Sequence, residues 1–309
     1  MPFRALFPLL IAGLLALPPG TARSDDLPRR AFLGIGYRAL TAAEAESLQV
    51  EGGLVVNRVL PGGPAEAAGL REGDVIRSID GEPISSESEL RTALRPRHAG
   101  DEIRLAVARA GTESTLTLLA GGAPEERADG VHIEYTSFES GGVRLRAVVA
   151  SPPDAAGKRL PALLLVSALG SPQLIGGSFH SAGREMAYAA ARAGYRALRV
   201  ELRGAGDSEG EDYRTTDFET EIADNLAAFD YLAGRPDVQP GRLFVYGHST
   251  GGIEAAVVAS RRPAAGLIVS CTVGRTHFER MADTIRLQGE LAGDPEVEID
   301  RGVAARLAF

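Results

Sequence analysis

The pattern of apolar segments changes at residues 121–130, a stretch rich in glycine, proline and acidic side chains. Before it, apolar residues form short runs separated by tight turns, which is typical of a β-rich domain. After it, apolar runs alternate with helical periods, which is typical of a sheet covered by helices. We therefore predict a β-rich domain over residues 31–120, a linker over residues 121–130 and an α/β domain over residues 131–309.

The first 22 residues have the parts of a secretory signal peptide. Arg4 supplies the positive start, Ala5–Leu17 is a short apolar run, and Gly20-Thr21-Ala22 fits the small-residue cleavage pattern. We expect an exported protein, periplasmic or secreted, with no stable membrane span after cleavage, because the apolar run is too short to cross a bilayer comfortably. An uncleaved anchor helix or an unstructured start is the alternative.

Composition excludes several classes of partner. The formal charge is −8, from 33 Lys and Arg against 41 Asp and Glu, which argues against nucleic acid because its binders carry a basic excess or stripe. The single cysteine, Cys271, allows no intrachain disulfide, and we expect it to be a buried strand residue. No histidine–carboxylate cluster has metal-ligand spacing and no phosphate-loop motif occurs, so we expect neither a metal nor a cofactor.

The first domain contains a long segment of glycine, proline and alanine that joins two apolar runs. It reads Val59-Leu60-Pro61-Gly62-Gly63-Pro64-Ala65-Glu66-Ala67-Ala68-Gly69-Leu70-Arg71-Glu72-Gly73-Asp74-Val75-Ile76. One helical turn fits before Gly69, and a second short helix follows the capping box of Ser86 and Glu89. The segment resembles bacterial-type PDZ domains, similar to those of high-temperature-requirement and carboxyl-terminal processing proteases.

This resemblance implies a peptide-binding site. In such domains a loop offers backbone N–H groups to a terminal carboxylate, and the peptide adds as a strand between the sheet edge and a helix. The loop here would use Leu33, Gly34 and Ile35, and the helix would present Leu90 and Leu94. Capture of protein C-terminal tails is one reading. A PDZ fold that serves as a spacer, or that holds the tail of its own chain, is an equal alternative.

The second domain predicts a mostly parallel, doubly wound sheet with helices on both faces. Leu160–Val166 is almost entirely apolar, as expected for a strand buried on both sides. A later helical period begins after a capping box that we assign to Thr216 and Glu219. Leu267–Thr272 is the last expected strand, and it would leave an apolar edge exposed.

The strongest chemical motif is Gly247-His248-Ser249-Thr250-Gly251, which fits G-x-S-x-G. It lies directly after the apolar strand Leu243–Tyr246 and directly before a helix, the context that a nucleophile elbow requires. Such a turn presents Ser249 Oγ at the carboxyl end of the strand, and the N–H of Thr250 can donate to an oxyanion. A glycine-rich turn without chemistry is the alternative.

Two further segments support a family resemblance. Ser167-Ala168-Leu169-Gly170 follows a buried strand, and Leu202-Arg203-Gly204-Ala205-Gly206-Asp207-Ser208-Glu209-Gly210 resembles the R-G-x-G-x-S-x-G turn of serine-aminopeptidase-like and dienelactone-hydrolase-like proteins. Residues 131–272 are thus similar to α/β-hydrolase-fold serine hydrolases. The resemblance implies ester or amide hydrolysis through an acyl-enzyme on Ser249, with Leu169 giving the second oxyanion N–H. It makes Asp207 a turn former.

The chain departs from the family after Ser249. The triad order is Ser, then an acid, then His, and only His277 follows the serine, at a position where a lid usually begins. Residues 279–309 read as helical and acidic, without the two further strand–helix units. We expect a fragment of a longer hydrolase. A natural truncation that only binds, or a rearranged site in which His277 acts with Glu279 or Asp283, are the alternatives.

The resulting expectation is a serine hydrolase that acts on an ester or peptide substrate and carries a PDZ module for peptide binding. Its α/β sheet is expected to be incomplete at the C-terminal end. The alternative function is a catalytically incomplete hydrolase that acts as an exported PDZ peptide-binding protein.

Overall fold

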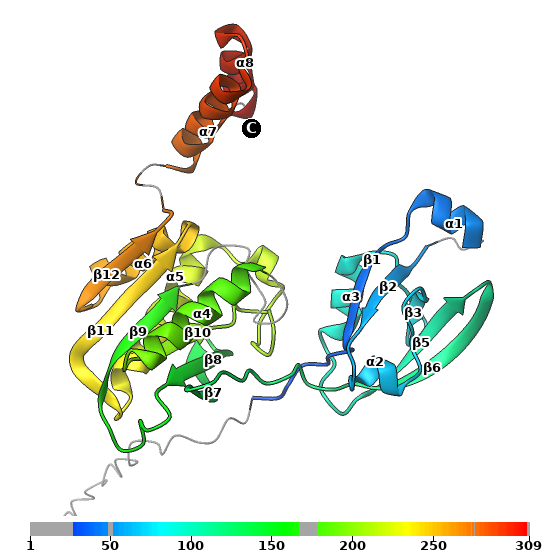
Figure 1. The fold of residues 1–309 in the computed structure, drawn as a ribbon, viewed down its shortest axis with the longest axis horizontal. Helices are drawn as coiled ribbons and strands as arrows, with labels where there is room; N and C mark the ends of the chain where they lie inside the picture. The colour runs from blue at the N-terminus through cyan, green and yellow to red at the C-terminus, as the bar shows by residue number, and fades with distance from the viewer. Residues whose placement is uncertain (1–26, 49–51, 167–177, 273, 275, 308–309) are drawn as a thin grey trace, which may run out of the picture.

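The computed structural model describes residues 27–48, 52–166, 178–272, 274 and 276–307 (Figure 1). The predicted signal peptide, residues 1–22, lies outside the described residues, as does Leu169. None of the helices in the described ranges combines the length and apolar character needed to cross a membrane. The described chain forms two separate sheets, each with its own core.

The first sheet is antiparallel and has the order β1-β2-β3-β5-β6, with β4 paired to β3. Its elements are β1 (Ile35–Ala39), α1 (Ala42–Leu48), β2 (Leu54–Val59), α2 (Pro64–Ala67), β3 (Val75–Ile79), β4 (Glu82–Pro83), α3 (Glu87–Leu94), β5 (Glu102–Arg109) and β6 (Thr112–Leu119). The predicted capping box of Ser86 and Glu89 is confirmed at the start of α3. In the described chain, β1 pairs only with β2, so its other edge is open.

The second sheet has the order β12-β11-β9-β10-β8-β7. Its elements are β7 (His132–Ser140), β8 (Val143–Ser151), β9 (Leu160–Val166), α4 (Ser178–Arg192), β10 (Arg196–Val200), the 3-10 helix η1 (Tyr213–Thr215), α5 (Phe218–Gly234), β11 (Val238–His248), α6 (Thr250–Arg261) and β12 (Gly266–Ser270). β7 and β8 form a hairpin, β8 joins β10 antiparallel, and β9 to β12 run parallel.

Helices cover both faces of the second sheet, which confirms the doubly wound α/β prediction. Along β9, Leu164 and Val166 pack with α5 and α6, whereas Leu163 and Leu165 pack with α4. All four side chains are buried, so this strand is apolar along its whole length because it faces a helical layer on each side.

Two local expectations are wrong. The N-cap of α5 is Asp217, whose side chain accepts the Thr220 N–H at 2.7 Å, and Thr216 instead ends the short helix η1. Cys271 is exposed and has φ 51°, because β12 ends one residue earlier at Ser270 and the chain turns there.

The C-terminal part of the described chain is a pair of helices, α7 (His277–Ala292) and α8 (Glu296–Leu307), which pack against each other. The pair projects away from the sheet (Figure 1). β12 forms the edge of the sheet in the described chain. Its side chains Leu267, Ile268 and Val269 are between 42% and 49% exposed, as expected for an apolar edge.

Candidate functional site

Ser249 occupies a sharp turn between a strand and a helix. β11 ends at His248, α6 begins at Thr250, and the Ser249 backbone lies at φ 55° and ψ −126°. A positive φ is uncommon for a residue with a side chain, and such strain persists only where surrounding contacts impose it. Two backbone hydrogen bonds do so here: Ser249 N–H donates to Ser270 O, and Ser249 O accepts from Gly252 N–H, each at 3.0 Å.

The glycine before the serine is required by close packing. A Cβ on Gly247 would lie 2.2 Å from Gly251 O and 2.7 Å from the Ala255 Cβ, distances that no side chain tolerates. The strand can therefore pass directly into the helix only with glycine at this position. The structure thus explains the G-x-S-x-G spacing, whereas the nucleophilic role of Ser249 stays a prediction.

The Ser249 side chain is half-buried, and its hydroxyl makes no hydrogen bond to any residue that the structure describes. The neighbouring His248 is also half-buried, and its Nδ1 lies 3.0 Å from Ser270 Oγ. The N–H of Thr250 lies at the N-terminus of α6, where helix N–H groups favour negative charge. The site therefore contains a serine followed directly by a helix N-terminus, and the oxyanion role of Thr250 stays a prediction.

For the other predicted catalytic groups, the described residues give no placement relative to Ser249. Leu169 lies outside the described residues, and His277 is the first residue of α7 with a side chain that is not described. Glu279 is held in a capping box with Thr276, and Asp283 pairs with Arg286 at 3.8 Å on the same helix. A pairing of His277 with either carboxylate therefore stays a prediction.

The carboxyl ends of β9, β10 and β11 meet at one edge of the sheet, where ligands of open α/β sheets bind. At this edge a cavity of about 20 Å³, room for about one water molecule, lies between the end of β10 and α5. Arg203 and Asp224 line the cavity and form an ion pair at 2.6 Å. Among the described residues, no group of His, Cys, Asp and Glu could hold a metal ion.

A pair of carboxyl groups is buried behind this edge. Glu221 on α5 and Glu254 on α6 are 7% and 2% exposed, and Asn225 donates to Glu254 Oε2 at 2.8 Å. Burial, with the neighbouring Glu221 charge as the second cause, raises the pKa of Glu254 to about 8, and burial also raises the pKa of Glu221. The pair therefore holds a proton at neutral pH, a feature that the sequence pattern did not indicate.

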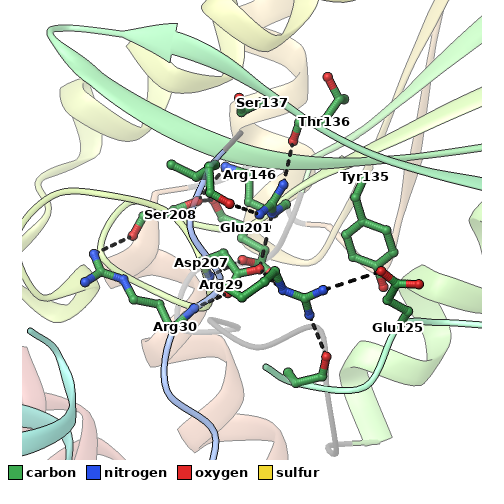
Figure 2. Close-up of polar contacts among 12 residues, drawn as sticks. Arg29, Arg30, Glu125, Tyr135, Thr136, Ser137, Arg146, Glu201, Asp207 and Ser208 are labelled. Atoms are coloured by element: carbon green, nitrogen blue, oxygen red, sulfur yellow. Dashed lines mark hydrogen bonds and ion pairs between the residues drawn. The ribbon is translucent and has the colours of Figure 1, made fainter. Parts of the chain in front are cut away.

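The turn that resembles R-G-x-G-x-S-x-G carries a second buried charge cluster (Figure 2). Asp207 Oδ2 pairs with Arg146 Nε at 3.3 Å and with Arg29 Nε at 2.6 Å, and the Arg146 side chain has no solvent exposure. Glu201 Oε2 accepts the Asp207 N–H at 2.5 Å, and burial, with the Asp207 charge second, raises the pKa of Glu201 to about 8. Asp207 was expected only to form a turn, but it also pairs with two arginines.

This cluster joins the two domains through the segment before β1. Asp207 Oδ1 accepts the Arg30 backbone N–H at 2.8 Å (Figure 2). Arg146 Nη2 donates to Leu27 O at 2.9 Å. The Arg30 guanidinium reaches Arg95 O at the end of α3 and Ser208 O. Residues 27–30 therefore connect the first domain to the turn formed by residues 202–210 of the second domain.

The predicted peptide loop lies directly after this segment. Leu33 and Gly34 are buried, Gly34 has φ 77°, and the N–H groups of both residues donate to no residue that the structure describes. Backbone N–H groups without a partner in the fold can donate to a ligand, so this loop is suited to an incoming carboxylate. Ile35 begins β1 at the open edge of the sheet.

The helix opposite this edge presents a face that sequence reasoning missed in part. Leu94 is half-buried, but Leu90 is only 2% exposed and belongs to the core, so it is closed to a peptide. Glu87 and Arg91 share a face of α3 with Leu94 because they lie at i, i+4 and i+7. That spacing could have identified Arg91 from the sequence.

Comparison with known proteins finds a family model that matches part of each domain. Residues 31–119 match the family model described as PDZ domain, and residues 176–294 match the model described as serine aminopeptidase, S33. The chain is 36% identical over 85 residues to the periplasmic pH-dependent serine endoprotease DegQ of Escherichia coli, which covers 27% of this chain and 19% of that protein. It is 36% identical over 104 residues to the magnetosome formation protease MamE of Magnetospirillum gryphiswaldense, with 33% and 14% covered.

The chain therefore spans about a quarter or less of the length of the curated relatives it matches. Among solved structures, the PDZ domain of HtrA3 bound to a phage-derived ligand matches 29% of this chain and 85% of its own at 26% identity, with a TM-score of 0.27. A putative dienelactone hydrolase from Klebsiella pneumoniae matches 48% of this chain and 63% of its own at 22% identity, with a TM-score of 0.37.

Proposed function

We propose that this chain, in which a PDZ domain precedes an α/β-hydrolase domain, is an exported serine hydrolase that cleaves ester or amide bonds. We place the PDZ domain at residues 31–120, the linker at 121–130 and the hydrolase domain at 131–309. The observation that carries the proposal is the backbone of Ser249, whose φ of 55° holds the serine in a strained turn at the carboxyl edge of a parallel sheet. Export is supported by the pattern of residues 1–22 and by the periplasmic proteases that share its PDZ domain.

The proposed chemistry is acyl transfer. Ser249 Oγ attacks the carbonyl carbon of the substrate, and the Thr250 and Leu169 N–H groups hold the oxyanion of the tetrahedral intermediate. Collapse expels the alcohol or amine and leaves an acyl-enzyme, which water then hydrolyses. His277 is the candidate base in this chain, because it is the only histidine that follows Ser249.

A fluorophosphonate probe tests the nucleophile directly, because it reacts with an activated serine hydroxyl. We expect labelling of the full chain that is lost in Ser249→Ala and kept in Ser260→Ala, a matched control on the exposed side of α6. If His277 is the base, labelling rises with pH through the ordinary histidine range and His277→Gln removes the rise. Folded protein that takes up no label would contradict the proposal.

A second proposed activity is capture of a peptide C-terminus by the PDZ domain. It is supported by the unpartnered N–H groups of Leu33 and Gly34 beside the open edge of β1. A fluorescent peptide with a free carboxylate is expected to bind, and the same peptide with a C-terminal amide is expected to bind much more weakly. Peptide binding without probe labelling would favour the alternative, an exported binding protein with an inert hydrolase portion.

A further inference from the structure

Arg91 on α3 has donors that none of the described residues satisfies. Its Nη1 pairs with Glu87 at 2.6 Å, but Nε and Nη2 are closed to solvent and donate to no residue that the structure describes. A buried charged donor without an acceptor is costly, and such groups point to a missing partner. The missing partner is therefore an acceptor that reaches Arg91 from outside the PDZ fold.

Arg91 lies on the face of α3 that also carries Leu94. Tyr37 on β1, the strand with the open edge, is half-buried; burial raises its pKa, and the charges of Glu87, Arg91 and Tyr213 also act on it. β1 begins beside the carboxylate loop, so Tyr37 lies two residues further along the strand than Ile35. A peptide added antiparallel to β1 would pass Tyr37 and Arg91 a few residues before its C-terminus.

The second domain reaches α3 at the proposed peptide groove between β1 and α3. Asp212 Oδ2 lies 3.8 Å from Arg91 Nε, close enough for attraction but too far for a hydrogen bond. Next to it, Glu211 Oε2 accepts from Arg95 Nη1 at 3.2 Å, so two acidic residues of the second domain face two arginines of the groove helix. Asp212 therefore pairs only weakly with Arg91, and another carboxylate could form closer hydrogen bonds with it.

We propose that Arg91 and Asp212 form a composite site between the two domains, in which Asp212 competes for Arg91 with C-terminal peptides that have an apolar last residue and a carboxylate side chain a few residues upstream. The peptide carboxylate displaces Asp212 from Arg91 and satisfies the unpaired Nε and Nη2 donors. The apolar requirement follows from Leu94 and Ile35, which are half-buried at the other end of the groove. This inference rests on the proposed peptide binding by the PDZ domain.

Occupation of this site would be sensed by the hydrolase domain. Glu211 and Asp212 directly follow the turn that carries Arg203 and Asp207, and Arg203 lines the cavity at the carboxyl edge of the sheet. The same turn is held from its other side by Arg30, three residues before the carboxylate loop. A peptide that displaces Asp212 therefore removes one of the contacts between the groove helix and this turn.

The test is fluorescence anisotropy on the full chain with two labelled peptides that end in leucine, one with an upstream aspartate at the third position from the end and one with asparagine there. We expect the aspartate peptide to bind about tenfold more tightly, as a charge-assisted hydrogen bond gives. Arg91→Gln is expected to remove this preference, whereas Arg104→Gln, an exposed arginine on β5, keeps it. Asp212→Asn is expected to tighten binding of the aspartate peptide alone by about two- to fivefold, the value of one exposed ion pair.

Asp212→Asn is chosen because asparagine preserves the cap that Asp212 forms on Arg214 N–H, and Glu219→Gln is its control on the exposed surface of α5. If both peptides bind equally well to the wild-type chain, or if Arg91→Gln retains the preference, the composite site is wrong while peptide binding stands. An Asp212→Asn variant with unchanged affinity overturns the competition between Asp212 and the peptide. If neither peptide binds, the proposed PDZ function fails and the composite site falls with it.

Discussion

Asp207→Asn is the substitution that best tests how the two domains are joined. The Asp207 side chain is almost fully buried and receives the Arg30 N–H and the charges of Arg29 and Arg146 (Figure 2). Asparagine keeps the shape and one acceptor but removes the negative charge. Arg146, which has no solvent exposure, would then lose its ion pair with Asp207.

The expected cost follows from the surroundings of the pair. Removing one partner of a buried ion pair costs about 3–5 kcal/mol. Two features lower this value: Arg29 is partly exposed, and Glu201, whose raised pKa owes part of its shift to Asp207, can ionise beside Arg146 once that charge is gone. We expect a loss of about 2–3 kcal/mol from the free energy of unfolding of the hydrolase domain, or roughly 4–12 °C in its melting temperature.

Urea unfolding and limited trypsin digestion measure the two consequences separately. The variant should unfold at lower urea concentration, and trypsin should cut faster at Arg29 and Arg30 because the segment is released from Asp207. Asp230→Asn is the matched control, since its pair with Arg262 is exposed and should be worth less than about 1 kcal/mol. An Asp207→Asn protein that matches the wild type within about 0.5 kcal/mol, with unchanged cleavage, would refute the reasoning.

Three further predictions follow from the hydrolase domain. Glu201 and Glu254 have pKa values near 8 in the fold and near 4.5 when unfolded, so their contribution to stability is complete below about pH 4.5. As the pH rises toward 8 this contribution is lost, by at most about 1.4 kcal/mol per pH unit for each group. Urea titrations at pH 6 and 8.5 should show the loss, and Glu201→Gln and Glu254→Gln should reduce it. Ser249→Gly should raise the melting temperature, because glycine relieves about 1–3 kcal/mol of backbone strain at φ 55°, and an unchanged or lower value in calorimetry would argue against a strained turn. Gly247→Ala should abolish probe labelling and lower stability by more than about 2 kcal/mol, since its Cβ would overlap Gly251 O, whereas an active, stable variant would contradict the packing described.

Much of the fold could be predicted because it depends on local patterns. Strand Leu160–Val166 follows from an unbroken apolar run, and the start of α3 from the spacing of Ser86 and Glu89. The same locality explains the errors: Asp217 rather than Thr216 caps α5, since both residue types are good N-caps and only the backbone path decides between them.

The candidate site was predictable only in its central turn. Gly247 and Ser249 are adjacent to the elements that shape them, so the motif and its context were sufficient to locate the turn. The role of Arg91 depends on Asp212, which lies 121 positions further along the chain (212 − 91) and belongs to the other domain. No periodicity or spacing connects residues at such a separation.

The amino-acid sequence alone determined the order of the two domains, the nature of each sheet and the position of the strained serine turn, because apolar period, glycine and capping residues act over a few neighbouring positions. The tertiary structure decided which charges are buried and what they face. Arg30 meets Asp207 across 177 positions, and Arg146 lies fully buried beside the same carboxylate. A charge can be buried at low cost only when an oppositely charged partner lies beside it with the right geometry. Where that partner is distant in the sequence, only the packing of the whole chain places it there.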